Sequence, residues 1–193
     1  SLVLARRLLS LRLERGGRLA IVAETDPDFL RFFFACQYAG LVPVALPASV
    51  NLGGHDAYVT RLRGLLQGRG ASAAMASNHF LRFLREAAEG ADLAFIGTPA
   101  AFDELPQRQT ELQSSGPAET AYLQYTSGST SFPRGVVITQ HAVLSNLIGV
   151  VNHGLDLQAD DRCVSWLPFY HDMGLVGCML APMATQRSID YLD

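Results

Sequence analysis

The chain has 193 residues, enough for one sizeable hydrophobic core, or for a large domain and part of a second. Apolar residues make up 49% and charged residues 17%, so we expect a folded chain rather than a disordered one. The net charge of −3 gives no electrostatic reason to expect a nucleic-acid partner. No apolar run reaches the about 20 residues that a membrane span needs, and no signal-peptide pattern opens the sequence. These features predict a soluble, cytoplasmic protein without a membrane span.

In chain order, short apolar runs alternate with amphipathic segments. The clearest helix follows Asp26 as N-cap and Pro27 at its first position, and it ends at Gly40. Strands that alternate with helices at this spacing predict an α/β fold of βα units with a mostly parallel sheet. Strands are expected at 19–23, 42–46, 73–76, 93–96, 121–125, 136–138, 160–166 and 188–192. Helices are expected at 2–13, 27–39, 58–67 and 80–89, and in a segment capped by Thr139 that ends near Gly154.

Three further features of this pattern can be checked in a structure. An aromatic stripe on the helix after Asp26, made of Phe29, Phe33, Phe34 and Tyr38, is expected in the core rather than in an acyl-chain pocket. Residues 98–119 are rich in Pro, Gln, Ser and Glu, which predicts an exposed connection. The strand at 188–192 has nothing after it to pack against, which suggests a piece of a longer protein.

The cysteines and histidines do not form a recognisable ligand pattern. Cys36, Cys163 and Cys178 lie far apart without paired spacing, so neither a zinc site nor a disulfide framework is indicated, and buried reduced thiols are expected. His141 and His153 are expected on the surface of the helix after Thr139. No metal-ligating residues are therefore predicted in this chain.

The stretch from Tyr122 to Val137 is the first candidate site. An apolar strand runs into a segment of hydroxyls and glycine, and Arg134 adds a permanent positive charge. Gly128 lets successive N–H groups point at an anion, and the neighbouring hydroxyls are further donors, so the segment suits a phosphate. The residues of this candidate site are Thr126, Ser127, Gly128, Ser129, Thr130 and Arg134. A solvated hairpin loop would have the same composition, whereas a Walker-type site is excluded because no Gly-Lys-Ser/Thr follows at the required spacing.

The second candidate site is the stretch from Leu167 to Gly174, which follows a predicted strand. It places His171 and Asp172 between aromatic residues and a glycine. Open α/β sheets present binding residues at the carboxyl ends of their strands. A purely structural His-Asp pair remains the alternative.

Both stretches resemble motifs of the AMP-forming adenylating superfamily. The first resembles its phosphate-binding signature, Tyr-Thr-Ser-Gly-Ser-Thr-Gly-x-Pro-Lys-Gly: Tyr125 to Thr130, Pro133 and Gly135 match, while Ser131 and Arg134 replace the usual glycine and lysine. The second resembles the Leu-Pro-x-x-His motif, and its Tyr-His-Asp-Met-Gly form is most similar to fatty acyl-AMP ligases.

The resemblance implies that residues 1–193 form the first part of the large N-terminal, ATP- and acyl-binding domain of such an enzyme. The rest of that domain and a mobile C-terminal domain would lie outside the chain, which alone is expected to be inactive. In the parent enzyme it implies that ATP, with Mg²⁺, activates a fatty acid to acyl-AMP with release of pyrophosphate, for transfer to an acyl carrier protein thiol. The catalytic residues would be His171 and Thr130, and Thr126 to Thr130 with Arg134 would bind the triphosphate. An acyl-CoA synthetase and a non-catalytic nucleotide- or acyl-binding module remain alternatives.

Overall fold

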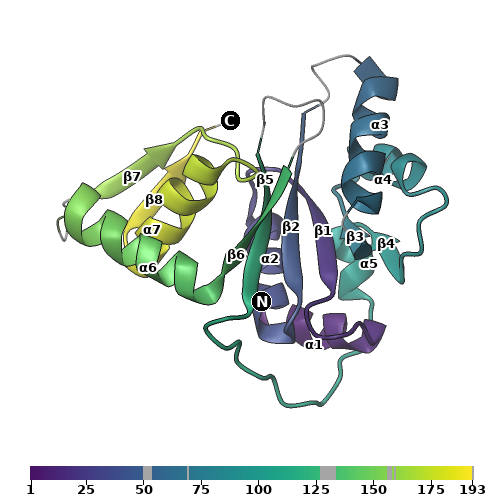
Figure 1. Ribbon diagram of the computed structural model, residues 1–193, viewed down its shortest axis with the longest axis horizontal. Helices are drawn as coiled ribbons and strands as arrows, with labels where there is room; N and C mark the ends of the chain where they lie inside the picture. Colours follow the sequence, from purple (N-terminus) through teal and green to yellow (C-terminus); the bar gives the residue numbers. More distant parts are fainter. Residues whose placement is uncertain (50–53, 69, 127–133, 156–157, 159, 193) are drawn as a thin grey trace.

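A computed structural model describes residues 1–193 apart from 50–53, 69, 127–133, 156–157, 159 and 193. Its centre is a six-stranded sheet in the order β4-β3-β1-β2-β5-β6 (Figure 1). Strands β4 to β5 in this order pair in parallel, and β6 pairs antiparallel to β5. The predicted α/β class with a mostly parallel sheet is confirmed. The strands are β1 (Arg18–Ala23), β2 (Val42–Pro47), β3 (Ala71–Met75), β4 (Phe95–Gly97), β5 (Thr120–Thr126) and β6 (Arg134–Thr139).

Side-chain alternation in β1 divides the core into two layers. Leu19 and Ile21 belong to a buried cluster with α1, α2 and α5, whereas Ala20 and Val22 belong to one with α3 and α4. Successive residues of a strand point to opposite faces, so the sheet is covered on both sides. The helices are α1 (Leu2–Leu8), followed by a 3-10 turn η1 (Leu9–Leu11), α2 (Pro27–Ala39), α3 (Gly54–Gln67), α4 (Leu81–Ala87) and α5 (Pro99–Asp103).

Helix α2 has the boundaries that its capping residues predict. Asp26 accepts a hydrogen bond from Phe29 N at 2.8 Å, and Gly40 ends the helix with φ +68°. The predicted aromatic stripe was partly wrong, because Phe32 is fully buried with Phe29 while Tyr38 is 45% exposed. The inward face follows the i, i+3, i+4 spacing from Phe29.

The prediction that 98–119 is simply an exposed connection was wrong at its start, where α5 forms. Thr98 caps this helix by accepting from Ala101 N at 3.3 Å, and Pro99 occupies its first position. Phe102 is fully buried and packs edge-on against Phe32 at 5.1 Å between ring centroids. One aromatic side chain therefore draws the first turn of a polar segment into the core.

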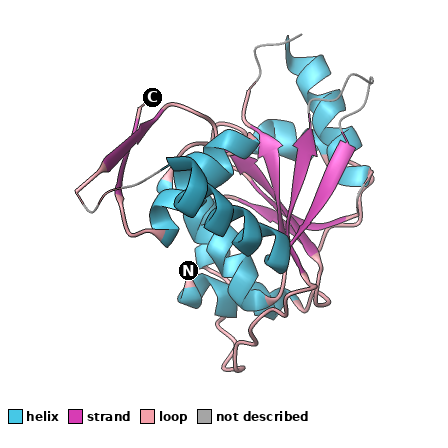
Figure 2. Cartoon of the chain, turned by 60° about the vertical axis from the view of Figure 1, so that its left-hand side comes forward, coloured by secondary structure: helices cyan, strands magenta, loops and turns pink. Residues whose placement is uncertain are grey.

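The carboxyl-terminal part packs around a second, two-stranded parallel sheet of β7 and β8, which stands apart from the main sheet in Figure 2. The strand expected at 188–192 is β8, and it pairs with β7, which comes earlier in the chain. Thr139 caps α6 as predicted, but Gly154 does not end it, because the helix continues after Val150 as a π-helical turn. The elements are α6 (Gln140–Val150), η2 (Val151–Leu155), β7 (Arg162–Ser165), η3 (Met173–Leu180), α7 (Ala181–Ala184) and β8 (Ser188–Tyr191).

Candidate functional site

The hydroxyl-rich stretch begins at the edge where the parallel strands have their carboxyl ends. Strand β5 ends at Thr126, whose backbone pairs with Arg134 at the start of β6. Residues 127–133 therefore connect two neighbouring strands at this edge. Ser127, Gly128, Ser129 and Thr130 lie outside the described residues, as does the side chain of Thr126. The side chain of Arg134 is exposed at the same edge, as a phosphate-binding role requires.

Strand β5 holds this edge in place through both of its faces. On one face, Tyr125 donates a hydrogen bond from its hydroxyl to the carbonyl of Leu65 in α3 at 3.0 Å. On the other, the Tyr122 ring lies 5.8 Å from that of Phe33 in α2. Tyr125, which matches the family signature, thus anchors the strand that leads into the loop.

The second candidate stretch docks on the start of α2, just beyond the carboxyl end of β1. Phe169 is fully buried, stacks on Phe29 at 5.1 Å and meets Tyr191 edge-on at 5.0 Å. Aromatic packing of this kind fixes both position and orientation. His171, two residues further on, is thereby held at the same edge of the main sheet as the end of β5.

The ring of His171 is 61% exposed, and its Nδ1 lies 2.7 Å from Oδ1 of Asp172. The backbone around it is tied down, because His171 N donates to Pro168 O at 3.0 Å and Leu175 N donates to His171 O at 2.8 Å. Asp172 caps the following helix by accepting from Met173 N at 2.7 Å. His171 Nδ1 also accepts from Met173 N, at 3.4 Å, so both side chains of the pair cap the helix as the structural alternative expects, while the His171 imidazole is accessible to a ligand.

Electrostatics link this stretch to the neighbouring strands. Burial, with a further contribution from the Asp172 carboxylate, raises the pKa of Tyr122 to about 12. Burial also raises the pKa of Tyr58 in α3, and the nearby Glu24 and Tyr170 raise it further. The Asp172 carboxylate thus adds to the raised pKa of a tyrosine on β5.

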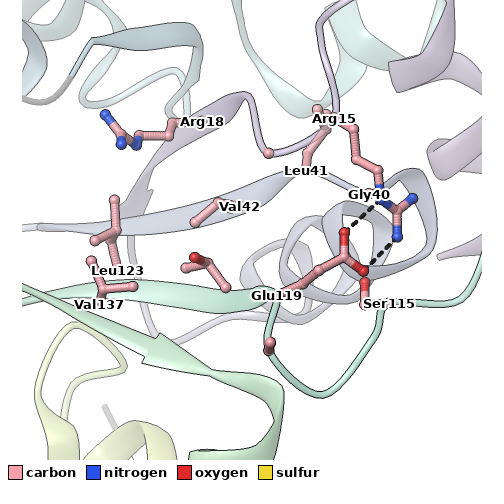
Figure 3. Close-up of a pocket in the computed structure, with 12 residues that line it drawn as sticks. Arg15, Arg18, Gly40, Leu41, Val42, Ser115, Glu119, Leu123 and Val137 are labelled. Atoms are coloured by element: carbon pink, nitrogen blue, oxygen red, sulfur yellow. Dashed lines mark hydrogen bonds and ion pairs between the residues drawn. The ribbon is translucent and has the colours of Figure 1, made fainter.

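The cavity in Figure 3, of about 390 Å³, lies at the opposite edge, where β1, β2 and β5 begin. Arg18, Val42 and Thr120 line it together with an ion pair between Arg15 and Glu119. A second cavity, of about 580 Å³, lies beside the start of α2 and includes Asp26 and Tyr191 in its walls. Neither cavity contains His171 or Arg134 among its lining residues.

Sequence reasoning overlooked Gln124, which is only 7% exposed in the middle of β5. A polar residue inside an otherwise apolar strand was the sequence feature that could have identified it.

The cysteine prediction holds for one residue: Cys36 is fully buried, and burial raises the pKa of its thiol, whereas Cys163 and Cys178 are partly exposed. His141 and His153 are exposed, as predicted.

Within the described parts of the chain, no group of three or more His, Cys, Asp or Glu side chains could hold a metal ion. None of the helices described has both the length and the apolar character needed to cross a membrane.

The family model described as "AMP-binding enzyme" matches residues 1–189. The chain belongs to this family of AMP-binding enzymes. A solved fatty acyl-adenylate ligase, from a study of these enzymes from E. coli and L. pneumophila, superimposes with a TM-score of 0.94 and 47% identity, covering 99% of this chain and 34% of that one. The resemblance predicted from the two motifs is confirmed.

Two sequence relatives extend the comparison. The long-chain-fatty-acid–AMP ligase FadD32 of Mycolicibacterium smegmatis is 38% identical over 87% of this chain and 26% of its own length. A candidate acyl-CoA synthetase of Caulobacter vibrioides is 40% identical over 100% of this chain and 33% of its own. The chain thus spans a third or less of the length of these relatives.

Proposed function

We propose that the full-length protein uses ATP to activate a fatty acid as acyl-AMP, with release of pyrophosphate, and passes the acyl group to the thiol of an acyl carrier protein. The observation that carries the proposal is the position of the signature: its residues connect β5 to β6 at the carboxyl edge of the sheet. The His171 stretch is docked beside this edge. The 47% identity to a fatty acyl-adenylate ligase supports the same reaction.

In this reaction a carboxylate oxygen of the fatty acid attacks the α-phosphorus of ATP, and the bond from that phosphorus to the β-bridging oxygen breaks. Most of the catalytic effect in such a step comes from positioning and from stabilising charge. The hydroxyls and N–H groups of 126–130 would bind phosphate oxygens, and the guanidinium of Arg134 would offset their charge. The accessible imidazole of His171 would border the carboxylate.

Magnesium would neutralise phosphate charge when it is bound with the nucleotide. Solved proteins of the same fold are MatB from Rhodopseudomonas palustris bound to ATP and MenE from Bacillus subtilis bound to ATP and a magnesium ion. Mg²⁺ prefers oxygen ligands, so phosphate oxygens, water and the hydroxyls within 126–130 would contribute to its coordination.

The acceptor thiol is the finer part of the proposal. The Tyr170-His-Asp-Met-Gly174 sequence favours a carrier protein, and the FadD32 relative is named an AMP ligase rather than a CoA ligase. The Caulobacter vibrioides relative favours CoA as a second candidate. Both acceptors present the same thiol, so discrimination must come from contacts to the rest of the acceptor.

The activity is tested by ATP–pyrophosphate exchange with the full-length protein, ATP, Mg²⁺ and a series of saturated fatty acids. Exchange that depends on the acid supports adenylation, and its absence for every acid would favour a non-catalytic binding module. CoA and holo carrier protein are then offered in separate reactions. The proposal is supported if the acyl group is transferred to the carrier protein and if acyl-AMP accumulates in the reaction that contains CoA. Rapid formation of acyl-CoA would assign the protein to the acyl-CoA synthetases.

A mutational arm tests the site itself. His171→Ala should lower the exchange rate by about 100-fold, as loss of a group that contacts the reacting centre commonly does, with little change in Tm. His141→Ala is the matched control, because His141 is an exposed histidine on α6. An unchanged exchange rate together with a lower Tm would make His171 a structural residue.

A further inference from the structure

Gln124 lies on the face of β5 that is turned toward α2. Tyr122 packs in the cluster with α2, while Leu123 belongs to the cluster with α3. Because side chains alternate along a strand, Gln124 shares the face of Tyr122. Only 7% of the residue is exposed, so its amide is directed into the packed layer between β5 and the helices on that side.

The amide nitrogen of Gln124 is buried and has no hydrogen-bond partner in the described structure. Three other described side chains also contain a buried polar atom without a hydrogen-bond partner: Arg7, Ser77 and Arg187. Each of these three residues is partly exposed as a whole. Buried polar groups are nearly always paired, and leaving a donor unpaired costs stability. Gln124 is therefore the described residue that stands out as more than nine-tenths buried with an unpaired donor.

A neighbouring glutamine has a hydrogen-bond partner for both polar atoms of its amide. Gln37 donates from Nε2 to the carbonyl of Ala121 in β5 at 2.6 Å, and its Oε1 accepts from Gln140 Nε2 at 2.6 Å. This side of the sheet can thus provide partners for a partly buried glutamine. The unpaired donor of Gln124 is a property of its own position.

That position is close to the edge where the two candidate stretches meet. Gln124 stands two residues before the end of β5 at Thr126 and two after Tyr122, whose phenol is influenced by the charge of Asp172. His171 adjoins Asp172. The donor of Gln124 is therefore in the buried layer next to the carboxyl end of β5, the end at which the predicted phosphate-binding stretch begins.

We propose that Gln124 is a substrate-binding residue whose Nε2 donates a hydrogen bond to an oxygen of the acyl group, first of the carboxylate and then of the acyl-AMP carbonyl. The proposal rests on the proposed function and adds a contact to it. A neutral, buried amide on the same strand face as Tyr122 suits an oxygen whose charge decreases as the adenylate forms. The charged and hydroxyl donors suited to phosphate belong instead to 126–130 and Arg134.

The test compares Gln124→Met in the full-length protein with wild type, because methionine keeps the size of the side chain and removes the donor. The KM for the fatty acid in ATP–pyrophosphate exchange should rise about tenfold, as for loss of one hydrogen bond. The KM for ATP should stay within about twofold, and Tm should not fall, because no protein partner is lost.

Gln37→Met is the matched control. It removes a glutamine whose donor and acceptor are both paired, so Tm should fall while the KM for the acid stays unchanged. A fall in Tm for Gln37→Met alone, and a rise in the KM for the acid for Gln124→Met alone, separate a structural donor from a ligand-binding one.

Two results would overturn the inference. A lower Tm with an unchanged KM for the acid would mean that Gln124 is paired within the full-length protein or by a bound water. An equal rise in the KM for ATP would assign the donor to the nucleotide instead. If wild type shows no exchange with any acid, the proposed function fails separately. Calorimetric titration of dodecanoate into wild type and Gln124→Met still tests the contact, and equal affinities for both proteins would overturn it.

Discussion

Gly174 is a position where a single methyl group would disturb the His171 stretch. A Cβ built on it would lie 2.2 Å from the carbonyl oxygen of Pro168 and 3.0 Å from that of Leu167. Both neighbours are backbone, so they cannot move aside as a flexible side chain would. The glycine thus allows η3 to start directly against the turn that carries His171.

Gly174→Ala should therefore lower stability by about 1–3 kcal/mol, the usual effect of overpacking, and reduce adenylation by displacing His171. Gly149→Ala is the control on α6, where a Cβ meets nothing within 4 Å and alanine should add up to about 1 kcal/mol of stability. Unfolding by urea and ATP–pyrophosphate exchange measure the two effects. Equal stability of Gly174→Ala and wild type would mean that the turn relaxes without cost.

At the residue level, the sequence predicts roles for side chains that belong to a local motif, and these roles stay predictions. Tyr125, Arg134 and His171 belong to such motifs, and the structure brings their segments to one edge. Gln124 could not be identified in this way, because an unpaired donor is defined by everything around it. A polar residue in a buried strand gives no indication of whether its neighbours satisfy it.

At the level of whole elements, the cap residues decided which boundaries could be predicted. Helix α2 carries Asp26, Pro27 and Gly40, and its ends agree with them. Helix α5 begins with the equivalent capping residues Thr98 and Pro99. The sequence prediction nevertheless followed the polar composition of the residues after them and missed the helix. Composition averages over a segment, whereas a short helix needs one cap and one buried aromatic side chain.

An ion pair connects the segment before β1 with the segment before β5. Arg15 donates to both carboxylate oxygens of Glu119, at 2.6 and 2.9 Å, and Gly116 N donates to the same carboxylate. The Arg15 hydrogen bond, followed by that from Gly116, lowers the pKa of Glu119 from 4.5 to about 2. The ionised form is thus favoured in the folded chain.

Because the folded-state pKa is the lower one, this contribution to stability is present above about pH 4.5 and is lost as the pH falls toward 2. Glu119→Gln should remove that component, so its free energy of unfolding should depend less steeply on pH between 4.5 and 2. Urea unfolding at a series of pH values measures both proteins. Identical pH dependence would show that the pair is fully screened by solvent.

The chain covers 34% or less of the length of the relatives described above. The resemblance implies that the parts of the enzyme outside residues 1–193 complete the active site. The 193-residue chain alone should therefore give ATP–pyrophosphate exchange at background, while circular dichroism shows it folded. Exchange above background with any fatty acid would contradict this expectation, and the full-length protein is the positive control.

The arrangement of the elements in space was the part that the sequence predicted least. Alternation of strands and helices indicated parallel pairing, but not that β1 lies between β2 and β3, nor that β7 and β8 form a separate sheet. Phe169 joins that second unit to α2, and only the folded chain shows this contact between residues 140 positions apart. Such long-range contacts are set by packing rather than by local pattern.

The central place of β1 has a consequence for how the protein is made. Its neighbours β2 and β3 are complete by Met75, so the middle of the sheet can assemble while most of the chain is still being translated. Strand β5 then joins the free edge of β2, and β6 follows it. The ribosome therefore delivers β5, the residues that follow it and β6 last among the parts of this sheet, onto a platform that already exists.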